Sequence, residues 1–351
     1  MSDKLPVSIC MIVKNEEAFL DASLKSISSV SVFEDIIVAD TGSDDRTKEI
    51  ALENGARVFD YIWCDDFSAA RNFAAEKAQH DWVLALDADE VVTSINKNEL
   101  KSFIKDKQYS IGAIKILSLP DRNPANISRF YNRVYYKWEG NIHEQIVPIG
   151  NHLKNIVPLQ IIADHYGYMP DIKEVKGKFE RNLRMLKTAL AENPGDPYIL
   201  AQLGKCHYVN GGDLSEACRF FEQSLQNDED YRLEYIYITV EYYGYSLLNT
   251  GQYEKALELI QKYSVYYNNK VEFRFLSAHV YQNNGLFQEA VESYESCIGA
   301  QIFDPQGITS FLSYYNIGVI LECVGMVEDA IAMYKNCGDY EQALQRLKVL
   351  E

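Results

Sequence analysis

Four consecutive residues, Asp87-Ala88-Asp89-Glu90, bring three carboxylates together at the end of an apolar segment, 81–87 (DWVLALD). The segment predicts a buried strand, and ligands bind open α/β sheets at the carboxyl ends of strands. Asp87 and Asp89, one residue apart on a turn, could bind a single divalent cation, because hard cations prefer oxygen ligands. We therefore predict a Mg²⁺ or Mn²⁺ site here, although an acidic turn that caps the next helix has the same composition.

A second group of polar residues, 40–45 (DTGSDD), follows the apolar stretch Asp35–Ala39. Asp40, at the end of this predicted strand, could accept a hydrogen bond from a nucleobase N–H or a ribose hydroxyl. Ser43 or Asp44 could equally cap the helix that follows. Binding and capping are both open on these residues alone.

Two polar residues, Arg71 and Asn72, lie early in the predicted helix Ser68–Ala78. Arg71 could reach a phosphate or a carboxylate, and Asn72 could read the edge of a base. Arginine is common on helix surfaces, so this prediction depends on what lies nearby.

A third segment, 138–145 (WEGNIHEQ), has the side chains for sugar binding and proton transfer. Trp138 offers a flat apolar face of the kind on which sugar rings stack. His143 and Glu144 are candidates for a general base or a metal ligand. Adjacent side chains of a strand point to opposite faces, so we expect only one of the two to enter the site. His165 could complete a metal shell, although a lone histidine is more often structural.

The elements that would position these residues change character near residue 170. Short apolar runs alternate with helical stretches through the first 90 residues, which predicts a parallel sheet with helices on its faces. Segments between 110 and 165 alternate as strands and predict a mixed or antiparallel extension over the carboxyl edge of that sheet. The domain boundary is expected at 168/169, with a helix over Lys178–Leu190 joining the two parts.

Residues 169–351 contain a helical repeat. Small residues recur at Gly204, Gly244, Ala278 and Gly318, with steps of 40, 34 and 40 residues. After Gly244, Ala278 and Gly318, a glycine follows seven residues later and an alanine twelve residues later. The first unit fits with one extra residue, as Gly212 and Ala217. This spacing predicts helix-turn-helix units of the tetratricopeptide type, in which small residues let paired helices approach closely.

Charge narrows the classes of ligand. The formal net charge is −17, with 18 Lys and Arg against 25 Asp and Glu in residues 1–170 and 16 against 26 in residues 171–351. Neither half would attract nucleic acid. No apolar run approaches the length of a membrane span, and the first residues do not look like a secretory signal. Seven cysteines without paired spacing suggest reduced thiols, and we expect a cytoplasmic protein.

Six segments in this order resemble inverting family 2 glycosyltransferases, especially bacterial members fused to tetratricopeptide repeats, a group that includes the peptide S-glycosyltransferases of glycocin (sublancin-type) biosynthesis. The segments are SICMIVKNEE, IIVADTGSDDRT, DDFSAARN, WVLALDADE, WEGNIHEQ and HYGY. The resemblance implies an α/β GT-A domain, a Rossmann-like nucleotide-sugar-binding fold, followed by an all-α repeat domain.

The resemblance also assigns expected roles to individual residues. Asp89 would bind the metal, with Asp87 and Ala88 beside the ribose and diphosphate of a UDP-sugar. Asp40 would lie in the nucleoside pocket, with Val13, Asn15, Arg71 and Asn72 around the donor. Many members have a second aspartate where this sequence has Thr41, so the uracil contact made by that aspartate does not carry over. The base is assigned to Glu144, with His143 next.

The expected activity is transfer of a hexose or N-acetylhexosamine from a UDP-sugar to a cysteine, serine or threonine of a peptide or protein. The repeats would dock the acceptor or form a homodimer. Three alternatives remain open: a lipid-linked or cell-envelope saccharide as acceptor, a repeat scaffold with an inactive transferase domain, and a nucleotidyltransferase. The last usually has a glycine-rich phosphate loop where this chain has Lys14-Asn15-Glu16-Glu17.

Overall fold

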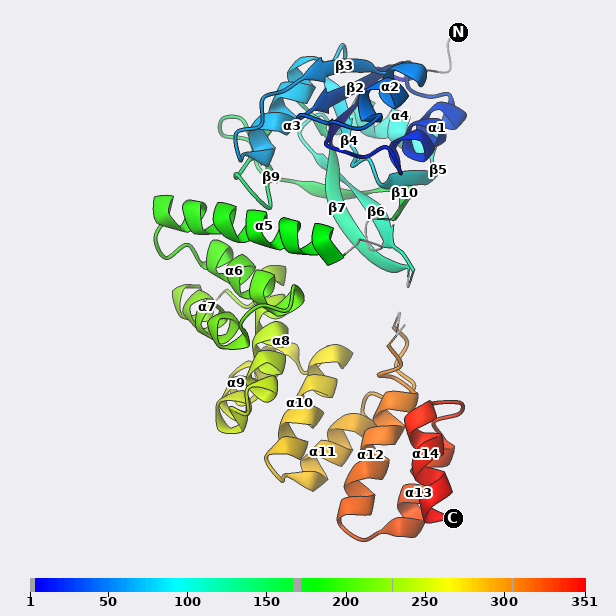
Figure 1. Cartoon of the computed structure of the whole chain (residues 1–351), viewed down its shortest axis with the longest axis vertical. Coiled ribbons are helices and arrows are strands. Elements are labelled where there is room, and N and C mark those ends of the chain that lie inside the picture. The colour runs from blue at the N-terminus through cyan, green and yellow to red at the C-terminus, as the bar shows by residue number, and fades with distance from the viewer. Residues whose placement is uncertain (1–3, 121, 167–171, 229, 303, 305) are drawn as a thin grey trace. The chain divides into compact units, whose positions relative to one another are not determined.

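The computed structural model describes residues 4–120, 122–166, 172–228, 230–302, 304 and 306–351. The chain divides into two compact units, Met1–Glu174 and Val175–Glu351. The first is an α/β unit and the second is helical (Figure 1). The predicted boundary at 168/169 lies outside the described residues. Over those residues, no helix is both long and apolar enough to cross a membrane.

An eight-stranded sheet forms the α/β unit, in the order β3-β2-β1-β4-β7-β6-β10-β5. β1, β2, β3 and β4 are parallel, while β7 runs antiparallel to both of its neighbours, β4 and β6. The strands of the sheet are Val7–Val13 (β1), Asp35–Asp40 (β2), Arg57–Asp60 (β3), Trp82–Ala85 (β4), Glu90–Ile95 (β5), Ile111–Ser118 (β6), Asn123–Asn132 (β7) and Ile156–His165 (β10).

The predicted mixed extension of the sheet exists. β7, β6 and β10 continue the main sheet sideways from β4, and the mixed strand directions are confirmed. Tyr136–Glu139 (β8) and Gln145–Pro148 (β9) form a separate two-stranded sheet. Strand patterning shows which face of a strand is buried but not which strand is its neighbour, so this order could not be predicted from the sequence.

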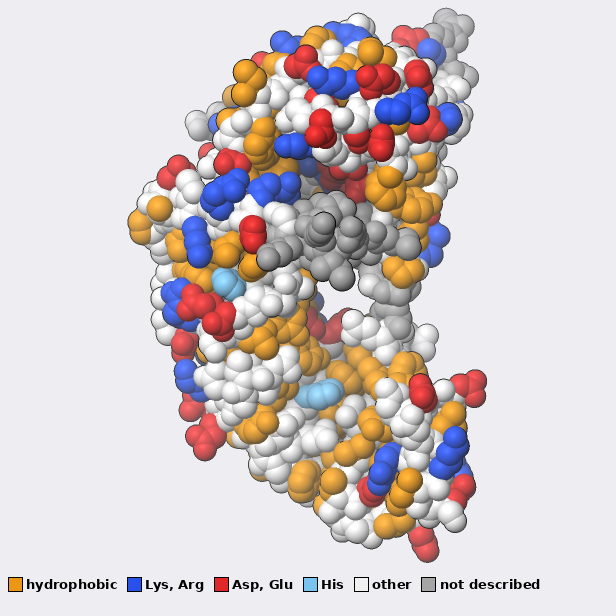
Figure 2. Space-filling model, viewed as in Figure 1, with side chains coloured by type: hydrophobic (Ala, Val, Ile, Leu, Met, Phe, Trp, Pro, Cys, Tyr) orange, Lys and Arg blue, Asp and Glu red, His pale blue; other side chains and the backbone are white. Residues whose placement is uncertain are grey.

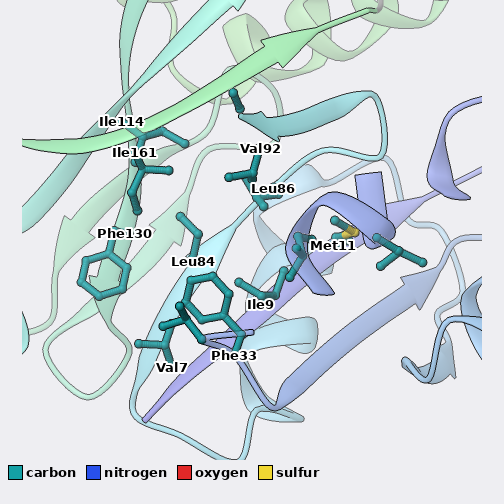
Figure 3. Close-up of a cluster of buried hydrophobic side chains, with 14 of the residues drawn as sticks. Val7, Ile9, Met11, Phe33, Leu84, Leu86, Val92, Ile114, Phe130 and Ile161 are labelled. Carbon is teal, nitrogen blue, oxygen red and sulfur yellow. The ribbon is translucent and has the colours of Figure 1, made fainter. Parts of the chain in front are cut away.

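Helices pack against the sheet because each has an apolar stripe. They are Leu20–Val30 (α1), Thr47–Glu53 (α2), Phe67–Glu76 (α3) and Lys97–Asp106 (α4). The larger core cluster joins the strands to α1 and α4. Figure 3 shows Val7, Ile9 and Met11 of β1 in this cluster together with Leu84 and Phe130. Asp66 caps α3 by accepting a hydrogen bond from the Ala69 amide (2.9 Å).

The helical unit consists of successive antiparallel hairpins preceded by one long helix, as predicted. The helices are Ile172–Glu192 (α5), Pro197–Val209 (α6), Leu214–Asn227 (α7), Glu234–Asn249 (α8), Tyr253–Tyr267 (α9), Val271–Asn283 (α10), Phe287–Glu295 (α11), Phe311–Cys323 (α12), Val327–Lys335 (α13) and Glu341–Leu350 (α14). Within α6 and α12, a Cβ added at Gly204 or Gly318 would lie 2.5 Å from Phe221 and 2.6 Å from Tyr334. Small residues therefore permit close packing within these hairpins.

Two details of the repeat differ from the prediction. At Gly244 the close neighbour is Leu276 of the next hairpin, at 2.7 Å, rather than a residue of the paired helix α9. In the first hairpin, Gly211 has the left-handed conformation (φ +68°) of the other turn glycines, such as Gly251 (φ +71°). Gly211 is seven residues after Gly204, so the extra residue of this unit follows the turn glycine and does not precede it.

Candidate functional site

The acidic turn lies where the sequence predicts, directly after β4. Its backbone closes with a hydrogen bond from the Glu90 amide to the Asp87 carbonyl (3.1 Å), and Glu90 begins β5. β1, β2 and β4 run in the same direction, with Val13 paired to Asp40 and Cys10 paired to Ala85. Asp40 and the acidic turn therefore lie at the same carboxyl edge of the sheet.

Asp87 is held by two arginines. Its Oδ1 accepts from Arg71 (2.8 Å) and its Oδ2 accepts from Arg129 (2.5 Å). Burial alone would raise the pKa of Asp87, but the charges of Arg129 and Arg71 outweigh it and hold the pKa well below the ordinary range. Because both oxygens accept from guanidinium groups, the structure does not support the prediction that Asp87 is a metal ligand.

Glu90 completes this arrangement from the other end of the turn. Its Oε1 accepts from Arg129 (2.8 Å), and its Oε2 accepts from the Asp87 amide (2.9 Å). The side chain is 2% exposed, and burial raises the pKa of Glu90 despite the opposing charge of Arg129. Glu90 thus ties the turn together rather than facing solvent.

Arg71 connects the acidic turn to the segment that contains Glu144. Its Nε donates to Glu144 Oε1 (2.6 Å), and its guanidinium carbon lies 5.0 Å from the centre of the Trp138 ring. The Arg71 side chain is 8% exposed, and its remaining terminal nitrogen is buried without a hydrogen-bond partner among the described residues. Arg71 thus reaches two carboxylates of the protein itself, and its predicted contact with the donor stays a prediction.

Trp138 and Asn72 differ from their predicted roles. Trp138 is 5% exposed, its Nε1 donates to the Tyr131 hydroxyl (3.1 Å), and its ring belongs to the core, so it offers no open face to a sugar. The Asn72 amide donates to the Trp138 carbonyl and accepts from the Trp138 amide, both at 2.9 Å. Asn72 fastens β8 to α3, which occupies the groups that would read a base edge.

The side chains of His143 and Glu144 differ in exposure and contacts. The two residues lie in the connection before β9 and not within a strand, so strand alternation is not the cause. His143 has a left-handed backbone (φ +54°) and an exposed side chain, while the Glu144 side chain is 12% exposed and faces Arg71. The hydrogen bond from Arg71 engages Oε1 of Glu144 and leaves Oε2 as a further acceptor. Of the two candidates for a base, Glu144 is the one that the structure joins to the acidic turn.

Asp89 and His165 form the remaining candidate for metal binding. β5 pairs with β10 so that Glu90 faces His165, and the Tyr166 amide donates to the Asp89 carbonyl (3.0 Å). His165 Nε2 lies 3.2 Å from Asp89 Oδ2, and this contact raises the pKa of His165. Across the described residues no three His, Cys, Asp or Glu side chains converge as a cation site. A cation bound by this pair would need phosphate oxygens and water as its other ligands.

Asp40 is almost fully buried at the end of β2. Its Oδ1 accepts from the amides of Gly42 and Ser43, both at 3.0 Å, and Lys48 Nζ is 3.5 Å away. Its Oδ2 is buried and, within the described parts of the chain, accepts no hydrogen bond. Asp40 therefore shapes the turn after β2 with one oxygen and keeps acceptor capacity on the other.

The turns after β1 and β2 are tied to each other. Asn15 (φ +55°) donates its amide to Ser43 Oγ (2.9 Å) and accepts from the Asp44 amide (3.0 Å). The Thr41 amide and hydroxyl both donate to the Val13 carbonyl (2.9 Å). These bonds fix the edge near Asp40, and the Thr41 hydroxyl is used inside the protein.

Arg129 is the site residue that sequence reasoning missed. It belongs to β7, between Ser128 and the buried Phe130 and Tyr131. The available clue is an arginine directly before two aromatic residues in a predicted strand, because an arginine buried with them would need a partner. The hydrogen bonds to Asp87 and Glu90 span 42 and 39 residues of sequence, a pairing that the sequence does not show.

This geometry defines an α/β domain with a charged ligand-binding edge, followed by helical repeats. Residues 8–150 match the glycosyl transferase family 2, and residues 271–301 match the tetratricopeptide repeat. The chain therefore contains a glycosyl transferase family 2 domain followed by a tetratricopeptide-repeat region.

Two of the relatives that match over more than half of the chain illustrate this similarity. A TPR repeat-containing protein of Synechococcus elongatus is 36% identical over 235 residues, which cover 63% of this chain and 56% of that protein. The SPbeta prophage-derived glycosyltransferase SunS of Bacillus subtilis is 24% identical over 233 residues, which cover 64% of this chain and 54% of that protein. The chain thus spans about half the length of these relatives. A match to the solved structure of MamA from residue 41 to its end, from Desulfovibrio magneticus RS-1, covers 50% of this chain and 98% of the solved chain, with 18% identity and a TM-score of 0.39.

Proposed function

We propose that this chain is an inverting glycosyltransferase that moves a hexose or N-acetylhexosamine from a UDP-sugar to a cysteine, serine or threonine of a peptide or protein. The observation that supports it most is the shared edge of β1, β2 and β4, where Asp40, Asp89 and the Arg71–Glu144 pair gather in a domain of this family. SunS, by its name a glycosyltransferase, is similar over 64% of this chain.

The donor would bind along this edge. Asp40 Oδ2, buried and without a hydrogen bond from the described residues, has the acceptor capacity to receive an N–H of the base or a ribose hydroxyl. Asp89 and His165 would hold Mg²⁺ or Mn²⁺ at the diphosphate, and the ion would offset the charge that develops on the departing UDP. Arg71 lies close enough to the turn to add positive charge there.

The transfer itself would be a single displacement at the anomeric carbon. The acceptor oxygen or sulfur forms a bond to that carbon as the bond to the UDP oxygen breaks on the opposite side. Glu144 would accept the proton of a hydroxyl acceptor through Oε2, while Arg71 keeps the carboxylate oriented through Oε1. A thiol acceptor ionises more readily and would depend less on this residue.

The repeats would dock the acceptor. Helix α8 packs against both α6 and α10, and ring contacts join these neighbours: Tyr208 with Tyr242, and Tyr245 with His279. Figure 2 shows hydrophobic side chains exposed across the middle of the visible face of this unit, while charged side chains lie both at its left margin and at its lower right. Aromatic side chains on stacked helices suit an extended peptide.

A thermal-shift series tests the donor class. Purified protein is heated with UDP, GDP, CMP and UDP-sugars, each with and without Mn²⁺. We expect stabilisation by UDP or a UDP-sugar that needs Mn²⁺, because binding to the folded state alone raises the unfolding temperature. No response to any nucleotide would contradict the proposed enzyme and favour a scaffold.

The role of Glu144 is tested separately with Glu144→Gln. We expect slower transfer to a hydroxyl acceptor and little change in UDP binding. An unchanged rate with a hydroxyl acceptor would show that another group is the base.

A further inference from the structure

We propose that Arg129 is a positioning residue of the donor site, which holds the turn 87–90 so that Asp89 faces His165. The inference rests on the proposed function, because it assumes that Asp89 and His165 bind a cation. It adds a residue outside the acidic motif and divides the two aspartates between two different tasks.

Arg129 fastens both ends of the turn. Its side chain is 8% exposed, and one terminal nitrogen donates to Asp87 Oδ2 and to Glu90 Oε1. The turn is closed a second time by Glu90, which accepts from the Asp87 amide while its own amide donates to the Asp87 carbonyl. The backbone of Asp89 is therefore held on both sides, in a position from which its side chain contacts His165.

The two aspartates therefore point to different partners. Asp87 uses both carboxylate oxygens on Arg71 and Arg129. Asp89 instead pairs with His165, on β10. One aspartate is an anchor and the other can serve as a ligand, which a spacing of two residues on a turn permits and the sequence alone does not distinguish.

Arg129 also balances charge in a buried cluster. Three carboxylates, Asp87, Glu90 and Glu144, contact two guanidinium groups, those of Arg71 and Arg129. Glu90 has no other ion-pair partner among the described residues. Removing Arg129 alone would leave Glu90 buried and unpaired, which is costly and could unfold the domain. A second substitution at Glu90 separates this effect from positioning.

The test compares Arg129→Lys, Arg129→Met, Glu90→Gln and the charge-balanced double variant Glu90→Gln/Arg129→Met. The glutamine introduced in place of Glu90 keeps an oxygen that can accept from the Asp87 amide, so the double variant loses the clamp on Asp87 without leaving Glu90 as an unpaired charge. Folding is followed by tryptophan fluorescence, since all three tryptophans (63, 82 and 138) lie in the α/β unit. UDP binding is measured by calorimetry over a range of Mn²⁺ concentrations.

We expect the double variant to fold, to reach the wild-type affinity for UDP at saturating Mn²⁺, and to need about 10- to 100-fold more Mn²⁺ to do so, the range for residues that orient metal ligands. The Mn²⁺ requirement of Arg129→Lys should lie between those of the wild type and the double variant, because lysine keeps the charge but lacks the planar guanidinium group. A folded double variant with the wild-type Mn²⁺ requirement would overturn the positioning role. If wild-type UDP binding were independent of Mn²⁺ or absent, the proposed donor site itself would fail, and the positioning role with it.

Discussion

The clamp that Asn72 forms on Trp138 gives a sharp test, because structure and sequence predict different results for Asn72→Ala. The side-chain amide makes two hydrogen bonds to the Trp138 backbone, both at 2.9 Å, and Trp138 is 5% exposed. Each such bond contributes about 1 kcal/mol. Without the Asn72 side chain, the Trp138 amide and carbonyl would lose these partners and would be poorly placed to reach water. We expect the free energy of unfolding of the α/β unit to fall by about 2–3 kcal/mol, the sum of the two bonds and this desolvation cost.

Equilibrium unfolding in urea, followed by tryptophan fluorescence, measures this loss in the unit concerned. A whole-molecule signal would mix two units that need not unfold together. Asn98→Ala is the matched control, since Asn98 is an exposed residue of α4 that lies outside the core, and it should change stability by less than about 0.5 kcal/mol.

The opposite pattern would refute this reasoning. If Asn72→Ala unfolded like the control but bound UDP much more weakly, Asn72 would be reading the base as the sequence suggested. A loss of stability with UDP affinity nearly unchanged would confirm the clamp.

Three further predictions concern other parts of the chain. Asp89→Asn should abolish Mn²⁺-dependent UDP binding in calorimetry; binding as in the wild type would remove Asp89 from the site. Gly318→Ala should cost about 1–3 kcal/mol because its Cβ would lie 2.6 Å from Tyr334, whereas Gly177→Ala, with nothing within 4 Å, should not destabilise; thermal unfolding by far-UV circular dichroism compares them. Burial raises the pKa of Glu241 to about 7, and the charge of Glu272 adds to this shift. The protonated Glu241 side chain therefore makes its full contribution to stability below about pH 4.5, and that contribution is lost as the pH rises through 7. The unfolding temperature of Glu241→Gln should therefore be close to that of the wild type at about pH 4.5 and higher than that of the wild type at about pH 8. Equal unfolding temperatures at the higher pH would contradict a raised pKa of Glu241.

Local features of the sequence were enough to predict much of the fold. Apolar runs marked β1, β2 and β4, and the small residues at Gly204 and Gly318 marked helix pairs that do approach closely. The acidic turn was placed correctly because a strand end can be read from the residues just before it.

What could not be predicted depends on pairing between distant residues. Arg129 meets Asp87 across β4 and β7, and Asn72 meets Trp138 across 66 residues. The sequence shows that such side chains can form hydrogen bonds but not with which groups. The sequence predicted that Asn72 and Asp87 contact a ligand, whereas in the structure both side chains make their hydrogen bonds to other residues of the protein.

The pairing of β5 with β10 has a consequence for how the chain folds during synthesis. Glu90 and His165 are register partners separated by 75 residues (165 − 90), and β6 and β7 lie between them in sequence. At roughly 5–20 residues per second, a ribosome needs about 4–15 s to add that stretch. The edge strand β5 must wait for its partner during this time, and Asp89 cannot meet His165 until β10 arrives. The repeats, whose helices pack on neighbours in sequence, can form as each hairpin emerges.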